Sequence, residues 1–377
     1  MFLPGSRRSP SPPHPPSKAQ SSPPIRVKSL SAEEPQRILI RATNWLGDAV
    51  MSLPALRAVH ERFPSAQITL LAIPWVADLY KREPFAHRVW LLRIRRGLHD
   101  LGAKWTLSRD LAREKFDWAI LLPNSFESAS LAFLSRIPIR LGYDRDARGR
   151  MLTHPVPVPQ EGVIPRHQSF YYLELLRRAG LIDSLPSEMT IRLEGLPAAR
   201  AAGLAMLEKF GARQPVIGVS PGAAYGGAKR WLPERFAEAA ARLYASLGGT
   251  VVVFGAPQEV AICHSVSAML REKGVQVIDV AGRTRLAEFV DMASACRVFL
   301  TNDSGSMHIA SAVGVPTVAV FGATDDAATG PTGPLAAVVR EPVECSPCLL
   351  RECPIDHRCM TRVSAEHVAE TAFTLLK

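Results

Sequence analysis

The chain of 377 residues is long enough for two domains, and 47% hydrophobic with 21% charged residues is the composition of a globular protein. No apolar run approaches the roughly 18–20 residues of a membrane-spanning helix, and no apolar segment follows Arg7 and Arg8 as in a secretory signal, so neither class is expected. The net charge of +10 arises entirely before residue 191. That excess predicts an acidic partner for the N-terminal half, unless it is only a generic basic surface.

Residues 1–36 contain nine prolines and eight serines and almost no apolar periodicity. Such a segment cannot bury enough apolar surface to offset the entropy lost on ordering. We therefore expect a disordered extension that takes no part in the fold.

From Arg37 onward, short apolar runs alternate with segments of helical spacing. Pro54 is compatible with a helix only near its start, and Gly180 is typical of a helix C-cap. The strands expected in this first series are 37–43, 67–73, 88–92, 117–122 and 139–143.

A second series follows a polar, proline-containing stretch near 184–214. Its expected strands are 216–220, 250–254, 275–280, 297–301 and 317–321, separated by helical segments. Two such series predict two doubly wound parallel-sheet α/β domains, with ligands bound outside the carboxyl ends of the strands. The expected division of the chain is 37–190, 191–344, and a cysteine-rich loop with a last helix at 345–377.

Three polar stretches stand where an expected strand ends and a helix begins. In the first, Asn44–Asp48, Gly47 permits a tight turn, and Asp48 is either the N-cap of the helix or a catalytic carboxylate. The second, Ser220–Trp231, is a glycine-rich loop that ends in Lys229 and Arg230, which suits a phosphate without matching a Walker motif.

In the third stretch, Asp303 and Ser304 precede an alanine-rich helix. Free backbone N–H groups at Ser304 and Gly305 would bind an anion there, with His308 one turn further on. The alternative is an ordinary cap with a buried histidine.

Four cysteines lie within fifteen residues, with the spacing C-x2-C-x4-C-x5-C. Four thiolates on one loop suit a structural zinc or iron ion, although the intervals are short for a zinc ribbon. A redox-labile or disulfide-forming loop and free thiols stay open as alternatives. The residues are Cys345, Cys348, Cys353 and Cys359.

Taken together, these motifs resemble the ADP-heptose:lipopolysaccharide heptosyltransferases of glycosyltransferase family 9, closest to the heptosyltransferase II branch. The resemblance covers residues 37–377 and depends on four separated motifs in order, of which a single one would not be specific. The four are RATNWLGDAVMSLPALRAV (41–59), LPNSF (122–126), PGAAYGGAKRW (221–231) and TNDSGSMHIA (301–310).

The resemblance implies a GT-B fold, in which two Rossmann-like domains face a central cleft. It implies inverting transfer of a heptose from ADP-heptose without a catalytic metal, with Asp48 as general base. It places the donor in the C-terminal domain, at Lys229, Glu259, Asp303, Ser304, Gly305 and His308. It places the acceptor at Asn44, Trp45 and Asn124, and the basic N-terminal half suits the anionic Kdo–lipid A inner core bearing a heptose.

Further expectations follow from the same resemblance. The enzyme would be cytoplasmic and would touch the cytoplasmic face of the inner membrane peripherally, and any metal on the cysteine loop would be structural. A heptosyltransferase I or III, or a protein-directed relative, is the near alternative because donor motifs are shared. A Rossmann oxidoreductase would need GxGxxG after the first strand, and the stacking aromatic residues expected of a nucleic-acid binder are sparse at 7%, so we expect neither.

Overall fold

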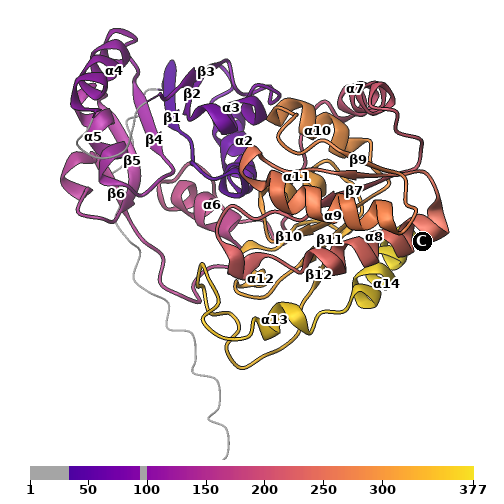
Figure 1. Ribbon diagram of the computed structural model, residues 1–377. Coiled ribbons are helices and arrows are strands. Elements are labelled where there is room, and N and C mark those ends of the chain that lie inside the picture. Colours follow the sequence, from indigo (N-terminus) through magenta and orange to yellow (C-terminus); the bar gives the residue numbers. More distant parts are fainter. Residues whose placement is uncertain (1–33, 94–99) are drawn as a thin grey trace, which may run out of the picture.

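The computed structural model describes residues 34–93 and 100–377, which form two α/β domains side by side (Figure 1). The proposed extension 1–36 lies almost wholly outside the described residues, so its expected disorder stays a prediction. Each domain is built around one six-stranded parallel sheet.

The two sheets are wound in the same way. The first has the order β3-β2-β1-β4-β5-β6 and the second the order β12-β11-β10-β7-β8-β9. The two orders match strand for strand when the second is read backwards, and the predicted fold class is thereby confirmed. The strands are β1 (Arg37–Arg41), β2 (Gln67–Ala72), β3 (Arg88–Leu91), β4 (Trp118–Leu121), β5 (Ile139–Asp144), β6 (His154–Pro157), β7 (Val216–Ser220), β8 (Thr250–Val253), β9 (Val277–Asp279), β10 (Val298–Asn302), β11 (Thr317–Val320) and β12 (Ala336–Val339).

Helices cover both sheets, and their ends follow the local sequence signals. Pro54 lies in the first turn of its helix, and Gly180 has φ +74 just after another helix ends, as the sequence predicts. The helices are α1 (Leu46–Met51), α2 (Leu53–Arg62), α3 (Pro74–Tyr80), α4 (Leu101–Arg113), α5 (Phe126–Leu134), α6 (Gln168–Arg178), α7 (Leu196–Lys209), α8 (Pro233–Leu247), α9 (Val260–Glu272), α10 (Leu286–Ser294), α11 (Gly305–Ala312), α12 (Asp326–Thr329), α13 (Arg358–Thr361) and α14 (Ala365–Leu376).

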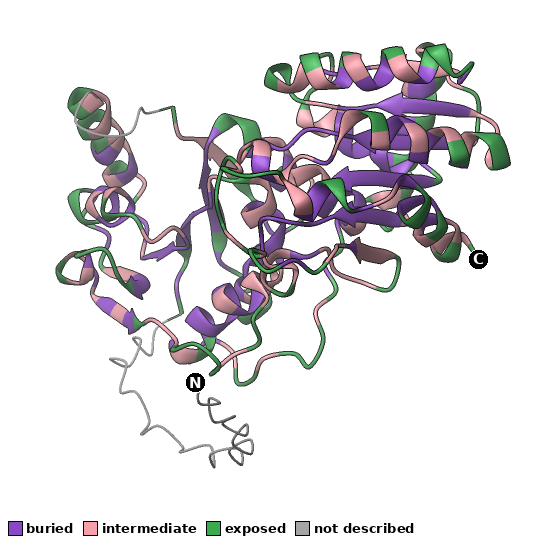
Figure 2. Cartoon of the chain, turned by 60° about the horizontal axis from the view of Figure 1, so that its bottom comes forward, coloured by how far each residue is buried: buried purple, intermediate pink, exposed green. Residues whose placement is uncertain are grey.

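Both faces of the sheets are buried, as helices on either side require. On β1, Ile38 and Ile40 belong to the largest apolar cluster, whereas Leu39 belongs to a separate cluster on the opposite face. Figure 2 shows the inner strands as buried and the outer helices as partly exposed. Among the described residues, no helix has both the length and the apolar character to cross a membrane.

The two domains pack directly against each other. Helix α1 of the first domain contacts α11 of the second, and α3 contacts α10. Arg82 and Asp291 form an ion pair of 2.5 Å across this junction. The carboxyl ends of β1 and β10, each followed by a predicted functional stretch, are thereby brought together.

Candidate active site

Asp48 lies in the first turn of α1 and is partly exposed. Trp45 occupies the N-cap position, so the interpretation of Asp48 as an N-cap is wrong. The Tyr172 hydroxyl, on α6, donates a hydrogen bond of 3.0 Å to Oδ1 of Asp48. Burial raises the pKa of Asp48, whereas this hydrogen bond and the charge of Lys229 lower it. A carboxylate held at one oxygen retains the other for a proton.

The predicted acceptor residues are held by partners that sequence reasoning missed. The Asn44 side chain accepts a hydrogen bond of 2.6 Å from Arg41, and its carbonyl accepts one of 3.0 Å from the indole of Trp75. Trp45, beside it, is 51% exposed. The first domain itself thus fixes Asn44, whereas the neighbouring Trp45 is open to solvent.

Asn124 follows β4 and lies between two further side chains. Its amide nitrogen donates a hydrogen bond of 2.8 Å to the Tyr171 hydroxyl, and its amide oxygen accepts one of 3.2 Å from Arg148. Arg148 is fully buried and also donates to the carbonyls of Tyr143 and Pro123. Burial lowers the pKa of this guanidinium to about 10. Arg148 therefore orients Asn124 without reaching solvent.

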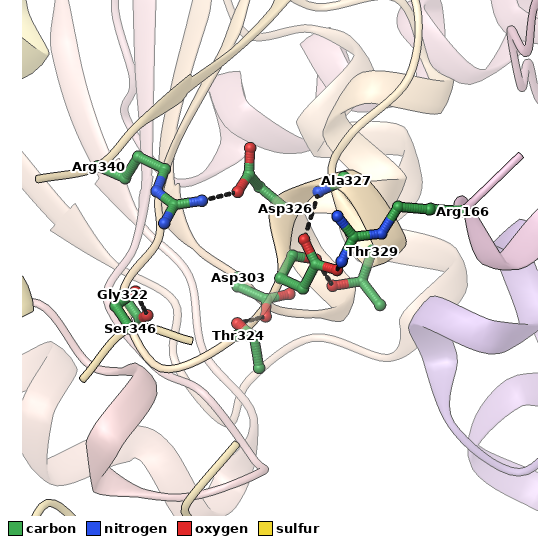
Figure 3. A network of polar contacts seen from close by, with 10 residues as sticks. Arg166, Asp303, Gly322, Thr324, Asp326, Ala327, Thr329, Arg340 and Ser346 are labelled. Carbon is green, nitrogen blue, oxygen red and sulfur yellow. Dashed lines mark hydrogen bonds and ion pairs between the residues drawn. The ribbon is translucent and has the colours of Figure 1, made fainter. Parts of the chain in front are cut away.

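The glycine-rich loop brings Lys229 to Asp303. The Lys229 ammonium lies 2.5 Å from Oδ2 of Asp303, and both side chains are largely buried. The Thr324 hydroxyl donates to the same oxygen, and Figure 3 shows this contact beside α12. Two residues from separate motifs, which the resemblance assigns to the donor, thus share one polar cluster.

Asn302, the last residue of β10, ties the glycine-rich loop to this strand. Its side-chain nitrogen donates a hydrogen bond of 2.8 Å to the carbonyl of Pro221, and its side-chain oxygen accepts one of 2.9 Å from the N–H of Trp231. Both ends of the loop are therefore fixed by one buried amide. The motif TNDSG contains this asparagine, but no local signal in it indicates such a role.

The first turn of α11 meets the Gly47–Asp48 turn. Ser304 is the N-cap of this helix, and Gly305 is its first residue. A β-carbon added at Gly47 would lie 2.9 Å from Cδ2 of His308, and one added at Gly305 would lie 2.8 Å from Cβ of Leu46. These two glycines are required because the two domains approach so closely here.

His308 is buried against that turn. Burial lowers its pKa to about 4, although the charge of Asp303 opposes this effect. The imidazole is therefore neutral near pH 7, with one ring nitrogen as donor and the other as acceptor.

Glu259 lies at the end of a short 3-10 turn after β8. Its carboxylate accepts a hydrogen bond of 2.9 Å from the N–H of Ala256, and a β-carbon at Gly222 would lie 2.2 Å from it. The carboxylate is thus placed directly beside the glycine-rich loop, on the side of the donor residues.

The four cysteines of the C-terminal loop are free, as are Cys263 and Cys296. Within residues 34–93 and 100–377, no group of three or more His, Cys, Asp or Glu side chains is arranged to hold a metal ion. The predicted metal loop has no ready-made site in this arrangement.

Comparisons with known proteins agree with this architecture. The family model described as glycosyltransferase family 9 (heptosyltransferase) matches residues 104–358. The chain is 31% identical over 315 residues to lipooligosaccharide heptosyltransferase 2 of Haemophilus influenzae, covering 80% of this chain and 88% of that protein. It is 30% identical over 308 residues to lipopolysaccharide heptosyltransferase 2 of Escherichia coli K12, covering 81% and 88%.

Among solved structures, the ADP-heptose lipopolysaccharide heptosyltransferase II of E. coli superposes with a TM-score of 0.76 at 28% identity. The match covers 90% of this chain and 98% of that one. Fold, motif order and sequence identity therefore agree, and the chain belongs to glycosyltransferase family 9, the heptosyltransferases.

Proposed function

We propose that this protein transfers L-glycero-D-manno-heptose from ADP-heptose onto the first heptose of the lipopolysaccharide inner core. Its similarity to heptosyltransferases 2 over four-fifths of the chain supports this acceptor. The observation that carries the proposal is the contact between the Gly47–Asp48 turn and the first turn of α11. It brings the turn that carries Asp48 next to the helix end that we assign to the diphosphate.

Asp48 is the general base of this reaction. As the acceptor hydroxyl oxygen attacks the anomeric carbon of the donor, its proton passes to the free oxygen of Asp48. The bond between that carbon and the phosphate oxygen breaks with inversion, and ADP leaves. No metal takes part in this step.

The departing ADP gains negative charge, and two groups stabilise it. The Lys229 ammonium is one, and the N–H groups at Ser304 and Gly305 are the other. In the structure Lys229 is bound to Asp303, so the diphosphate must share or displace this partner. Glu259 beside Gly222 is suited to the ribose hydroxyls of the donor.

His308 contacts the heptose rather than the diphosphate. An imidazole with a pKa of about 4 carries no positive charge at neutral pH and has little attraction for phosphate. A neutral ring that both donates and accepts a hydrogen bond matches a sugar hydroxyl. Asp303, on the same segment, holds the donor through its pairing with Lys229.

The acceptor binds to the first domain, at Asn44, Trp45 and Asn124. The basic excess of this half of the chain supports an anionic glycolipid, whose Kdo carboxylates and lipid A phosphates need cations nearby.

A transfer assay tests the proposal. ADP-heptose is mixed with truncated lipopolysaccharide that bears either no heptose or one, and products are weighed by mass spectrometry. We expect one added heptose only on the mono-heptosylated acceptor. Addition to the heptose-free acceptor indicates a heptosyltransferase I activity, and no addition to either, with donor bound, indicates another acceptor.

We also propose that the enzyme is cytoplasmic and docks on the anionic inner membrane through α4 and α5. These neighbouring helices are joined by the ion pair of Lys104 with Glu127. They expose large apolar side chains, and α4 also exposes basic ones such as Arg109 and Arg113. The apolar side chains are Leu101, Trp105, Phe126, Phe133 and Leu134. Apolar and basic groups together suit the surface of an anionic bilayer.

Vesicle flotation checks this docking. We expect binding to vesicles that contain phosphatidylglycerol, weaker binding at high salt, and little binding to pure phosphatidylcholine. Trp105→Ala should weaken binding by about tenfold, since one buried aromatic side chain is removed from the bilayer. Leu335→Ala, at an exposed apolar position in the second domain, serves as the control. Equal flotation of Trp105→Ala and wild type contradicts the assignment.

The cysteine loop remains the proposed place of a structural zinc or iron ion. Burial raises the pKa of the Cys359 thiol, and the charges of Cys345, Cys348 and Cys353 raise it further. A metal would have to draw them around one centre. Elemental analysis of protein purified without added metal should find about one zinc or iron per chain. Protein that is purified without metal and has the same Tm as protein supplied with zinc or iron contradicts a structural metal ion on this loop.

A further inference from the structure

The C-terminal cysteine-bearing segment, residues 345–359, lies directly on the glycine-rich loop, although more than a hundred residues separate them. We call these the cysteine loop and the donor loop (Ser220–Trp231). The Tyr225 hydroxyl donates a hydrogen bond of 2.9 Å to the carbonyl of Leu349, and the Ala228 N–H donates one of 2.9 Å to the carbonyl of Arg351. The two loops are therefore joined through backbone and side chain.

The side chains of Glu352 and His357 contact the short turn that carries Lys229. Oε1 of Glu352 accepts a hydrogen bond of 2.9 Å from the N–H of Gly227, the first residue of the 3-10 turn Gly227–Lys229. A ring nitrogen of His357 lies 3.0 Å from the carbonyl of Ala228, in the same turn. Each backbone polar group engaged here would otherwise bind water, because so short a turn satisfies few of its own groups.

This loop-on-loop packing requires a glycine at 226, and it places Gly227 against the flexible end of the Glu352 side chain. A β-carbon at Gly226 would lie 2.2 Å from the carbonyl oxygen of Arg351, and one at Gly227 would lie 2.3 Å from Oε2 of Glu352. No side chain fits at Gly226 without separating the loops. Gly226 therefore serves the cysteine loop, whereas the sequence suggests only flexibility around a phosphate.

The cysteine loop is also fixed at its other end. The Leu349 N–H donates a hydrogen bond of 2.7 Å to the carbonyl of Ala323. The Ser346 hydroxyl donates one of 2.6 Å to the carbonyl of Gly322, as Figure 3 shows. Thr324, which follows Ala323 in the chain, donates a hydrogen bond to the carboxylate of Asp303. The loop thus spans from the turn that carries Lys229 to the segment that holds the partner of Lys229.

We propose that the cysteine loop is part of the donor site and that Glu352 is a positioning residue for Lys229. The inference rests on the proposed role of the donor loop in binding ADP-heptose. Glu352 acts without touching the donor: it holds the Gly227–Lys229 turn, and the turn presents the ammonium to the diphosphate. The cysteine loop performs this role with or without a metal.

The test compares three variants of the full-length enzyme by calorimetric titration with ADP and by steady-state kinetics. Glu352→Ala removes the acceptor of the Gly227 N–H, and we expect the Kd for ADP and the KM for ADP-heptose to rise about fivefold, the net effect of one hydrogen bond of ordinary strength. Gly226→Ala should raise both further. Glu344→Ala, which removes an exposed acid next to the same loop, should leave both unchanged.

A positioning role also requires the acceptor KM of Glu352→Ala to stay at the wild-type value and its Tm to fall by no more than one lost hydrogen bond explains. Adding Glu352→Ala to Lys229→Ala should have little further effect on ADP binding, because the group it positions is already absent. Unchanged ADP affinity in Glu352→Ala, or full additivity with Lys229→Ala, overturns the inference and leaves the proposed function intact. Wild-type enzyme that does not bind ADP overturns both.

Discussion

Replacing Asp48 by alanine is expected to lower the turnover of heptose transfer by about 10²- to 10⁴-fold, the usual contribution of a general base. The Kd for ADP should change little, because the carboxylate belongs to the first domain, whereas the proposed diphosphate site belongs to the second. Single-turnover kinetics and calorimetric titration with ADP measure the two quantities separately. Asp78→Ala, at an acid paired with Lys81 on the nearby α3, is the control. Turnover at the wild-type level removes Asp48 as the base.

The pH profile of the wild-type enzyme should report the same carboxylate. A general base acts deprotonated, so turnover falls as the pH drops through the Asp48 pKa. Burial raises this pKa, which places the loss of activity at a higher pH than for an ordinary aspartate near 3.9. Tyr172→Phe removes a hydrogen bond that lowers the pKa, so the acidic limb should move to still higher pH.

Tyr171→Phe provides the matched comparison for Tyr172→Phe. Its hydroxyl binds Asn124 instead of Asp48, so its acidic limb should stay where the wild-type limb lies. If the acidic limb of the Tyr172→Phe pH profile coincides with that of the wild-type enzyme, the Tyr172 hydroxyl does not influence the pKa of Asp48.

The strands that position the site could be predicted because each signal is local. The run Arg37–Arg41 is apolar and β-branched, and it ends directly before the Asn44–Asp48 stretch. Parallel strands bring their carboxyl ends to one edge of a sheet, and the resemblance assigns the motifs after β7 and β10 to one donor site. Lys229 bound to Asp303 is an instance of this expectation.

Two strands were missed, and both lie at an edge of a sheet. The strand β6 contains Pro155 and Pro157, and proline normally argues against a strand. It is tolerated here because an edge strand needs hydrogen bonds on one side only. The strand β12, Ala336–Val339, is too short and alanine-rich to show β periodicity.

The partners of the predicted site residues could not be predicted from the sequence. Tyr172 lies on a helix 124 residues after Asp48, and its spacing indicates only a buried helical position. Arg148 belongs to an arginine-rich stretch that suggests a solvated turn, yet it is fully buried beneath Asn124. Such pairings depend on how elements far apart in the sequence pack against each other, and no local pattern in one amino-acid sequence indicates them.

Replacing Lys229 by alanine is expected to weaken ADP binding by about 10- to 100-fold, as for a lost charged hydrogen bond to phosphate. It should also lower the stability of the second domain by about 3 kcal/mol, because the buried carboxylate of Asp303 loses its counter-ion.

The double variant Lys229→Ala, Asp303→Asn separates the two effects of losing Lys229. Removing the orphaned charge should restore most of the Tm, whereas the affinity for ADP should stay low because the ammonium is still absent. Recovery of both quantities in the double variant would show that Lys229 serves only to neutralise Asp303. Lys229→Ala should also move the acidic limb of turnover upward, since its charge lowers the pKa of Asp48. One lysine would then influence both halves of the reaction: the leaving group by direct contact and the base through its field.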